Sequence, residues 1–254
     1  MINKKKGFYT LIAFILSMLA IYNINNKKQD LNQIIVGISL DNPPYEYLDN
    51  TKLAAGIDVD IIKLIGKELK KEIIIKNIDL NGLIPALQSQ NIDLVISGIE
   101  QTDARSKMVD FSIPYLSTSM AVVYNTLGGE MKNIQDLSGK IVGVQSSSSW
   151  ESYAHKLSKK DNSIEVRSLP NNLNIITELK LHTVNAMIVE TSQAKIFTNH
   201  NKKLNYFSIP DTTSYFAIAV NKKSRVLLKD VNRVLLHLKN TGKIRDIVNK
   251  YSDM

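Results

Sequence analysis

The sequence predicts an α/β protein made of two lobes. Past residue 30, short apolar runs alternate with longer amphipathic segments, which is the order of strands and helices in a parallel sheet with covering helices. The same alternation starts again after about residue 119. The C-terminal part of the chain is long enough to return to the first unit, so we expect two lobes joined by two crossovers.

The first unit has the predicted order β-α-β-α-β. Apolar residues recur at helical spacing in its first helix, where Ile61, Leu64, Ile65 and Leu69 share one side. The expected strands are 34–38, 72–78 and 93–96, with a short extended piece at 45–48, and the expected helices are 58–69 and 82–90.

The second unit repeats this order, and a C-terminal tail follows it. The expected strands of the unit are 120–124, 141–145, 164–168 and 186–189, and its expected helices are 150–157, 172–181 and 192–200. The tail is predicted to contain an extended run at 215–220 and two helices at about 224–238 and 242–251.

The N-terminus has the pattern of an export signal. Three lysines at residues 4–6 precede an apolar run over residues 8–24, and a polar stretch follows. Because Met18 stands where a cleavage site usually has a small residue, an uncleaved anchor within residues 1–28 is the alternative to a cleaved signal. Both alternatives predict export, and we expect the protein in the periplasm.

Composition excludes several kinds of site. The formal net charge is +8, but the lysines lie near the N-terminus or along helical faces without an arginine and aromatic stripe, so we expect no nucleic-acid binding. The lack of cysteine excludes disulfides, thiol catalysis and Cys-ligated metals. The four histidines are scattered, and no zinc, calcium or phosphate-loop spacing is present. We therefore expect no cofactor and no metal.

A candidate anion site follows the apolar run 94–96. Ser97 and Gly98 come directly after that run, and Thr102 can cap a short helix that contains Arg105. Glycine lets a backbone N–H approach an anion closely, and an arginine fork facing backbone donors and a hydroxyl suits a carboxylate. An exposed arginine in a first helical turn is the simpler alternative.

Two polar features follow strands of the second unit. The serines 146–149 lie between a strand and a helix, where they are either an anion site or a plain loop with one helix cap. Glu190 follows the apolar residues 187–189 and is either a carboxylate facing a cleft or a cap of the next helix. Arg105 and Glu190, on different lobes, would complement the carboxylate and the ammonium group of a free amino acid.

Eight segments share their order and spacing with one known family. They are Pro44-Tyr45, Gly56 to Asp60, Gly82 to Leu87, Asp93 to Gly98, Thr102 to Arg105, Asp110 to Tyr115, Asp136 to Val144 and Gly242 to Ile244. On these segments, which cover nearly the whole mature chain, the sequence resembles the polar amino-acid family of periplasmic solute-binding proteins of ABC transporters.

The resemblance implies the two-lobed periplasmic-binding-protein fold of type II, with a cleft and two hinge crossovers. It implies that lobe 1 comprises residues 31–118 plus 214–254 and that lobe 2 comprises residues 119–213. It also implies a monomeric, non-enzymatic receptor that captures a polar L-amino acid and delivers it to the membrane subunits of an ABC permease. The alternative is a dehydratase acting on a small carboxylic acid on the same scaffold.

The resemblance further implies roles for single residues. Arg105 would bind the ligand carboxylate, assisted by the Gly98 region and by Ser149 on the second lobe. Ser147, where relatives have Gly, would lie near the ammonium group, and Glu190, which replaces the usual Asp, would neutralise that group.

Positions near the ligand side chain depart from the family pattern. Asn42 and Leu80 replace common aromatic residues, and Ser39 occupies a position that is often Asp. Glu100 stands where many relatives have a Ser or Thr that donates to the ligand carboxylate, so it would repel that group or turn toward a cationic side chain. Glu100 and Asp41 favour a basic or polar amino acid such as arginine, lysine or glutamine.

Overall fold

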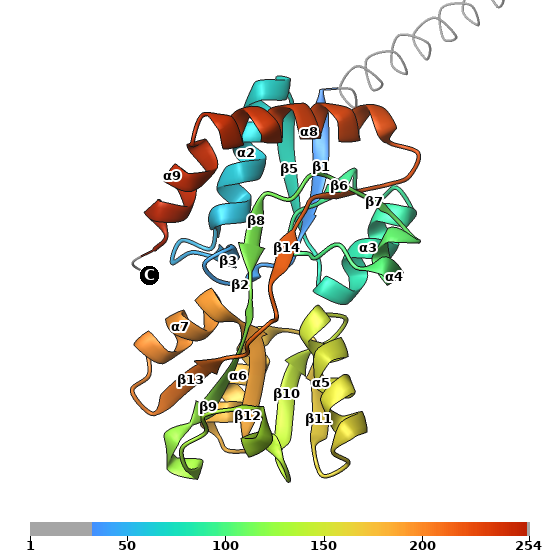
Figure 1. Ribbon diagram of the computed structural model, residues 1–254. Helices are drawn as coiled ribbons and strands as arrows, with labels where there is room; N and C mark the ends of the chain where they lie inside the picture. Colours follow the sequence, from blue (N-terminus) through green and yellow to red (C-terminus); the bar gives the residue numbers. More distant parts are fainter. Residues whose placement is uncertain (1–31, 253–254) are drawn as a thin grey trace, which may run out of the picture.

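The structure is a computed structural model, and it describes residues 32–252. It contains two five-stranded sheets with helices packed on them, one in each lobe (Figure 1). The predicted export signal lies outside the described residues.

Lobe 1 is built on a mixed sheet. Its strands are β1 (Gln33–Ile38), β5 (Glu72–Asn77), β6 (Leu94–Val95), β7 (Asp110–Phe111) and β15 (Ala219–Val220). They lie in the order β5-β1-β6-β15-β7. β1 pairs in parallel with β5 and β6, whereas β15 pairs antiparallel with β6 and β7.

Helices and a small second sheet complete lobe 1. The helices are α2 (Ile57–Leu69), α3 (Leu80–Gln88), α4 (Asp103–Ser106), α8 (Arg225–Asn240) and α9 (Lys243–Lys250). The small sheet consists of β2 (Asp41–Asn42), β3 (Glu46–Leu48) and β4 (Ala54–Ala55). The chain thus returns to lobe 1 for its last two helices, with α8 lying across the end of the lobe that faces away from lobe 2 (Figure 1).

Lobe 2 has the same plan. Its strands are β9 (Met120–Asn125), β10 (Ile141–Gln145), β11 (Glu165–Leu169), β12 (Ala186–Glu190) and β13 (Leu204–Ser208), in the order β11-β10-β12-β9-β13. Its helices are α5 (Ser149–Lys160), α6 (Asn172–Lys180) and α7 (Thr191–Asn199), with short 3₁₀ turns η1 (Thr126–Gly128) and η2 (Ile134–Leu137). β9 is antiparallel to β12 and β13.

Two strands connect the lobes. β8 (Leu116–Thr118) and β14 (Ser214–Phe216) pair antiparallel and pass side by side between the two main sheets (Figure 1). A paired two-strand connection restricts relative motion of the lobes to bending and twisting at a few residues, which is the geometry of a hinge.

The continuous apolar runs form strands because both faces of each sheet are covered. In β9, Met120 and Val122 belong to one hydrophobic cluster, and Ala121 and Val123 to another. Successive side chains of a strand point to opposite faces, so a strand buried on both faces needs apolar residues at every position. Each large aliphatic side chain buried in this way contributes about 1.5–3 kcal/mol.

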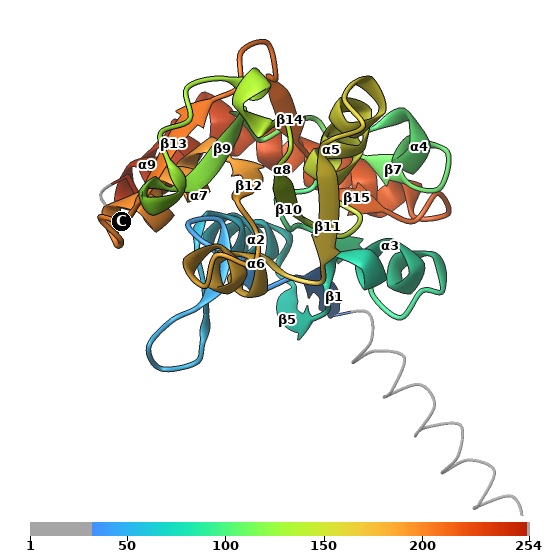
Figure 2. The same ribbon diagram turned by 90° about the horizontal axis from the view of Figure 1, so that it is seen from below.

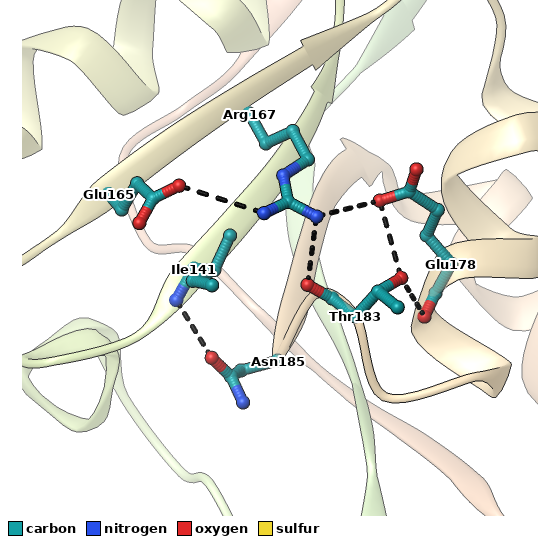
Figure 3. A network of polar contacts seen from close by, with 6 residues as sticks. All are labelled: Ile141, Glu165, Arg167, Glu178, Thr183 and Asn185. Carbon is teal, nitrogen blue, oxygen red and sulfur yellow. Dashed lines mark hydrogen bonds and ion pairs between the residues drawn. The ribbon is translucent and has the colours of Figure 1, made fainter.

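An arginine fixes the edge strand of lobe 2. Arg167 of β11 forms ion pairs with Glu165 at 3.7 Å and with Glu178 of α6 at 3.1 Å, and it donates to the carbonyl of Thr183 at 3.0 Å (Figure 3). Nearby, in a separate contact, Asn185 accepts from the N–H of Ile141 at 2.8 Å (Figure 3). These contacts tie β11 to α6 and to the turn before β12.

The structure differs from the predicted elements in the short strands β2, β4, β7 and β8, which were not expected, and in three larger respects. The sheets are mixed rather than parallel, because β9, β13 and β15 run antiparallel to their neighbours. β13 was not expected, because its alternating polar residues give a weak strand pattern. The run 215–220 is divided into β14 and β15, since the chain there leaves the hinge and joins the sheet of lobe 1.

None of the helices in residues 32–252 combines the length and apolar character needed to cross a membrane.

Candidate functional site

Arg105 lies where the two lobes meet. Thr102 caps α4 by accepting from the N–H of Arg105 at 3.2 Å, as the sequence predicted for this residue. The Arg105 guanidinium donates to the Glu100 carbonyl at 3.0 Å and, across the lobe boundary, to the Ser147 carbonyl at 2.7 Å. Burial lowers the pKa of Arg105, and the charge of Glu100 opposes that shift.

The Glu100 carboxylate also contacts the opposite lobe. It is 7% exposed and accepts a hydrogen bond from the Ser149 hydroxyl at 2.7 Å. Ser149 is the residue predicted to help hold a ligand carboxylate, so Glu100 engages the donor that such a ligand would use.

The serine loop combines a helix cap with lobe contacts. Ser148 is the N-cap of α5 and accepts from the N–H of Glu151 at 3.0 Å. Ser147 has a positive φ of 66°, and its N–H donates to the Glu151 carboxylate at 2.7 Å. This turn directs the Ser147 carbonyl to Arg105 and leaves the Ser149 hydroxyl, one residue into the helix, for Glu100.

Glu190 is buried at the end of β12 and caps α7. It is 1% exposed and accepts from the N–H groups of Ser192 at 2.8 Å and Gln193 at 3.1 Å. It also accepts from the hydroxyl of Thr118 in hinge strand β8. Burial raises the pKa of Glu190, and these donors oppose the shift. The capping role foreseen as one alternative is therefore present, but on a buried side chain rather than on a surface one.

A cavity of about 330 Å³ brings several of the predicted residues together. Leu80, Thr102, Arg105, Ser147 and Ser149 line it, so residues from both lobes contribute. Glu190 is not among its lining residues, and Arg105 and Glu190 form no ion pair in the described part of the chain. The two predicted ends of the ligand site are thus present at the lobe boundary without touching each other.

The remaining predicted residues lie deeper in lobe 1. The Asn42 amide donates to Glu46 at 3.1 Å, and the N–H of Ser39 donates to the Ser97 hydroxyl at 3.0 Å. Gly98 has φ +50°, and a Cβ there would lie 2.9 Å from the Asn42 amide nitrogen, so both conformation and space favour glycine.

Asp41 connects the two lobes through hydrogen bonds. Its carboxylate accepts from the Gln145 amide at 2.9 Å and from the N–H of Asn172 at 2.9 Å, both in lobe 2, and from the Ser39 hydroxyl at 2.8 Å. Burial raises its pKa, and the N–H of Asn172 gives the largest opposing effect. Oδ2 of Asp41 is occupied by donors from lobe 2 and Oδ1 by the Ser39 hydroxyl of lobe 1. The expectation that Asp41 favours a cationic ligand stays a prediction.

Other lobe contacts involve residues that the sequence did not single out as site residues. Tyr45 lies beside Glu190 and donates from its hydroxyl to Ser192 at 3.3 Å, and Gln145 and Asn172 bind Asp41. These side chains resemble ordinary strand-end and helix-start residues in the sequence, and only the packing of one lobe on the other gives them a role.

Comparison with known proteins identifies the family. Residues 34–254 match the family described as bacterial extracellular solute-binding proteins, family 3. The chain belongs to this family. The predicted family resemblance and the two-lobed fold are therefore confirmed.

Individual relatives of this solute-binding protein cover most of its length. The arginine-binding extracellular protein ArtP of Bacillus subtilis (strain 168) is 32% identical over 222 residues, covering 86% of each chain. The probable histidine-binding protein of Campylobacter jejuni is 28% identical over 237 residues, covering 90% of this chain and 88% of the relative. A solved structure, an ancestral arginine-binding protein bound to arginine, has a TM-score of 0.83 at 32% identity and covers 87% of this chain and 98% of its own.

Proposed function

We propose that this solute-binding protein captures a basic L-amino acid, with arginine the first to test, and serves an ABC transporter. The charge at the lobe boundary carries the proposal. Glu100 and Glu190 lie there as buried carboxylates, in addition to Asp41, and Arg105 is the candidate carboxylate-binding cation. Such a boundary has an excess negative charge, which an amino acid with a cationic side chain would offset.

Each charged end of arginine has a candidate partner. The ligand carboxylate would replace the carbonyl contacts of Arg105 and take the Ser149 hydroxyl from Glu100. Glu100, thus released, would pair with a cationic group of the ligand, since it would otherwise lie beside a second carboxylate. Glu190 would balance the ligand ammonium. Relatives and structural neighbours that are named for arginine support this choice.

Binding would stabilise the closed arrangement of the lobes. Arg105 and Ser149 already bridge lobe 1 and lobe 2, so a ligand held by both adds contacts that only the closed form provides. We propose that the closed form then docks on the permease as a monomer in the periplasm and that the ligand is released chemically unchanged. We also propose lobe boundaries within β8 and β14, at residues 118 and 214.

Isothermal titration calorimetry with arginine, lysine, glutamine and glutamate tests the proposal. We expect arginine to bind with a Kd near 1 μM, equivalent to roughly −8 kcal/mol, and glutamate to bind most weakly. Binding of glutamate as tight as that of arginine, or no binding of any of the four below millimolar concentration, would refute it. Recovery of altered ligand after incubation would show that the protein is an enzyme.

A further inference from the structure

Two fully buried carboxyl groups lie next to each other in lobe 1, apart from those at the lobe boundary. Glu46 of β3 is 1% exposed and Asp58 of α2 is 0% exposed. The N–H of Asp58 donates to the carbonyl of Tyr45, the residue before Glu46, at 2.8 Å, and the two carboxyl groups lie close enough for the charge of Asp58 to raise the pKa of Glu46. A hydrogen bond between two carboxyl groups requires that one of them carry a proton.

The donors around the pair account for only two of its four oxygens. Asp58 Oδ2 accepts from the N–H of Gly98 at 2.7 Å and from the Tyr115 hydroxyl at 2.8 Å. Glu46 Oε1 accepts from the Ser97 hydroxyl at 3.1 Å and from the Asn42 amide at 3.1 Å. The other two oxygens, Glu46 Oε2 and Asp58 Oδ1, have no donor from any other described group. A single proton between these two oxygens would satisfy both.

No cation offsets the charge of the pair within residues 32–252. Neither carboxyl group forms an ion pair there, and Lys250 at the end of α9 pairs instead with Asp60, further along α2. The ionisable groups that interact with the pair are Asp41 from β2 and Tyr115 from the loop before β8, and Tyr45 lies beside Tyr115 and Glu190. All of these are acids, so ionisation of both carboxyl groups would leave two uncompensated buried charges.

We propose that Glu46 and Asp58 hold one proton in common and that this proton-sharing pair positions the Ser97-Gly98 loop and Asn42 beneath the ligand. The pair acts as a positioning element. It fixes the Gly98 N–H, the Ser97 hydroxyl and the Asn42 amide by accepting hydrogen bonds from them. The identity of the ligand rests on the proposed function, whereas the proposal that the two carboxyl groups share a proton is independent of it.

The raised pKa values of the pair determine whether the stability of the protein rises or falls with pH. Burial, and then the charge of Asp58, raise the pKa of Glu46 well above its usual value, and burial raises the pKa of Asp58 to about 6. At a pH between the unfolded and the folded pKa values of these two groups, the folded protein therefore keeps protons that the unfolded chain has lost. The associated stability is complete below about pH 4 and falls as the pH rises through 6 and on toward the higher folded pKa of Glu46.

Amide substitutions distinguish two explanations of the pair. In one, the two carboxyl groups share a proton; in the other, the site needs only two polar side chains. In Glu46→Gln the amide can donate to Asp58, and in Asp58→Asn the amide can donate to Glu46, so each single variant keeps the hydrogen bond without a shared proton. In the double variant both amide oxygens must still accept from the outer donors, which are Gly98 and Tyr115 at one residue and Ser97 and Asn42 at the other. The two NH₂ groups then face each other, and neither has an acceptor.

The experiment measures the melting temperature of the ligand-free protein from pH 6.5 to 8.5. We expect the wild-type melting temperature to fall by about 3–5 °C per pH unit, and the slope to be shallower in both single variants. The double variant should have the lowest melting temperature at every pH. Hydrogen exchange of the peptide containing Gly98 should be about tenfold faster in the double variant, in proportion to the lost protection of its amide.

Asp49→Asn is the matched control, because this exposed acid has a pKa lowered by hydrogen bonds from Thr51 and Leu53 and titrates only in the acid range. It should keep the wild-type slope. A Glu46→Gln variant with the wild-type slope would overturn the shared proton. A double variant with the Gly98 exchange of the single variants would overturn the positioning role. Neither readout needs a ligand, so failure of arginine to bind would count against the proposed function alone.

Discussion

Among the buried carboxyl groups of residues 32–252, Glu100 and Glu190 differ from Glu46 and Asp58 in where their hydrogen-bond donors come from. Glu100 and Glu190, at the lobe boundary, accept from Ser149 of the other lobe and from Thr118 of the hinge. Glu46 and Asp58 accept only from within lobe 1. Figure 2 shows the same two lobes from below, with α5 of lobe 2 beside α4 of lobe 1.

The origin of the hydrogen-bond donors decides whether a contact can be exchanged for a ligand or stays in place when the lobes part. A donor from the opposite lobe is lost when the lobes part, so a ligand can replace it at little cost. A donor from the same lobe stays in place in both arrangements. Glu100, whose donor Ser149 belongs to the opposite lobe, is therefore suited to exchange that donor for a ligand. Glu190 can exchange the Thr118 hydroxyl but keeps the N–H donors of Ser192 and Gln193. The buried pair is suited to holding the site in one shape. Three substitutions test this comparison.

The largest effect is expected from Arg105→Lys. Lysine keeps the charge but loses the planar fork, so the Kd for arginine should rise about 10- to 100-fold, the loss of one or two charge-assisted hydrogen bonds. Arg167→Lys in lobe 2 is the matched control, because Arg167 is held in the network between β11 and α6 (Figure 3). It should lower thermal stability and leave the Kd unchanged. Equal affinities of wild type and Arg105→Lys by calorimetry would remove Arg105 from the site.

A smaller and more selective effect is expected from Glu100→Gln. If Glu100 pairs with a cationic group of the ligand, the substitution should weaken arginine binding about tenfold and leave glutamine binding unchanged or tighter, since glutamine lacks the cationic side chain. Competition calorimetry with both amino acids measures the ratio. A parallel change for the two ligands would show that Glu100 does not distinguish charge.

The smallest effect is expected from Tyr115→Phe, which removes one donor from Asp58 and leaves the Gly98 N–H in place. Unfolding in urea should show a loss of about 1 kcal/mol, with little change in arginine affinity. A loss of affinity as large as that of Arg105→Lys, at unchanged stability, would place Tyr115 with the boundary residues and break the comparison.

The position of the candidate site could be predicted from sequence, but its contacts could not. Arg105, Thr102 and Ser149 were expected near an anion because they follow apolar strands or open helices, and they line one cavity. The pairing of Glu100 with Ser149 joins residues 49 positions apart. No local pattern signals such a contact, because it depends on how one lobe packs on the other.

By itself, the sequence determined the alternation of strands and helices, since apolar periodicity reflects which face of an element is buried. Tertiary structure decided strand direction: β9 runs antiparallel to β12 and β13 because the chain enters lobe 2 there from the hinge, and β15 runs antiparallel to β6 and β7 because the chain returns through the hinge. It also decided that Asp41 joins the lobes and that Glu46 and Asp58 meet. The charge state of a carboxyl group depends on its burial and its neighbours, and both are properties of the folded chain.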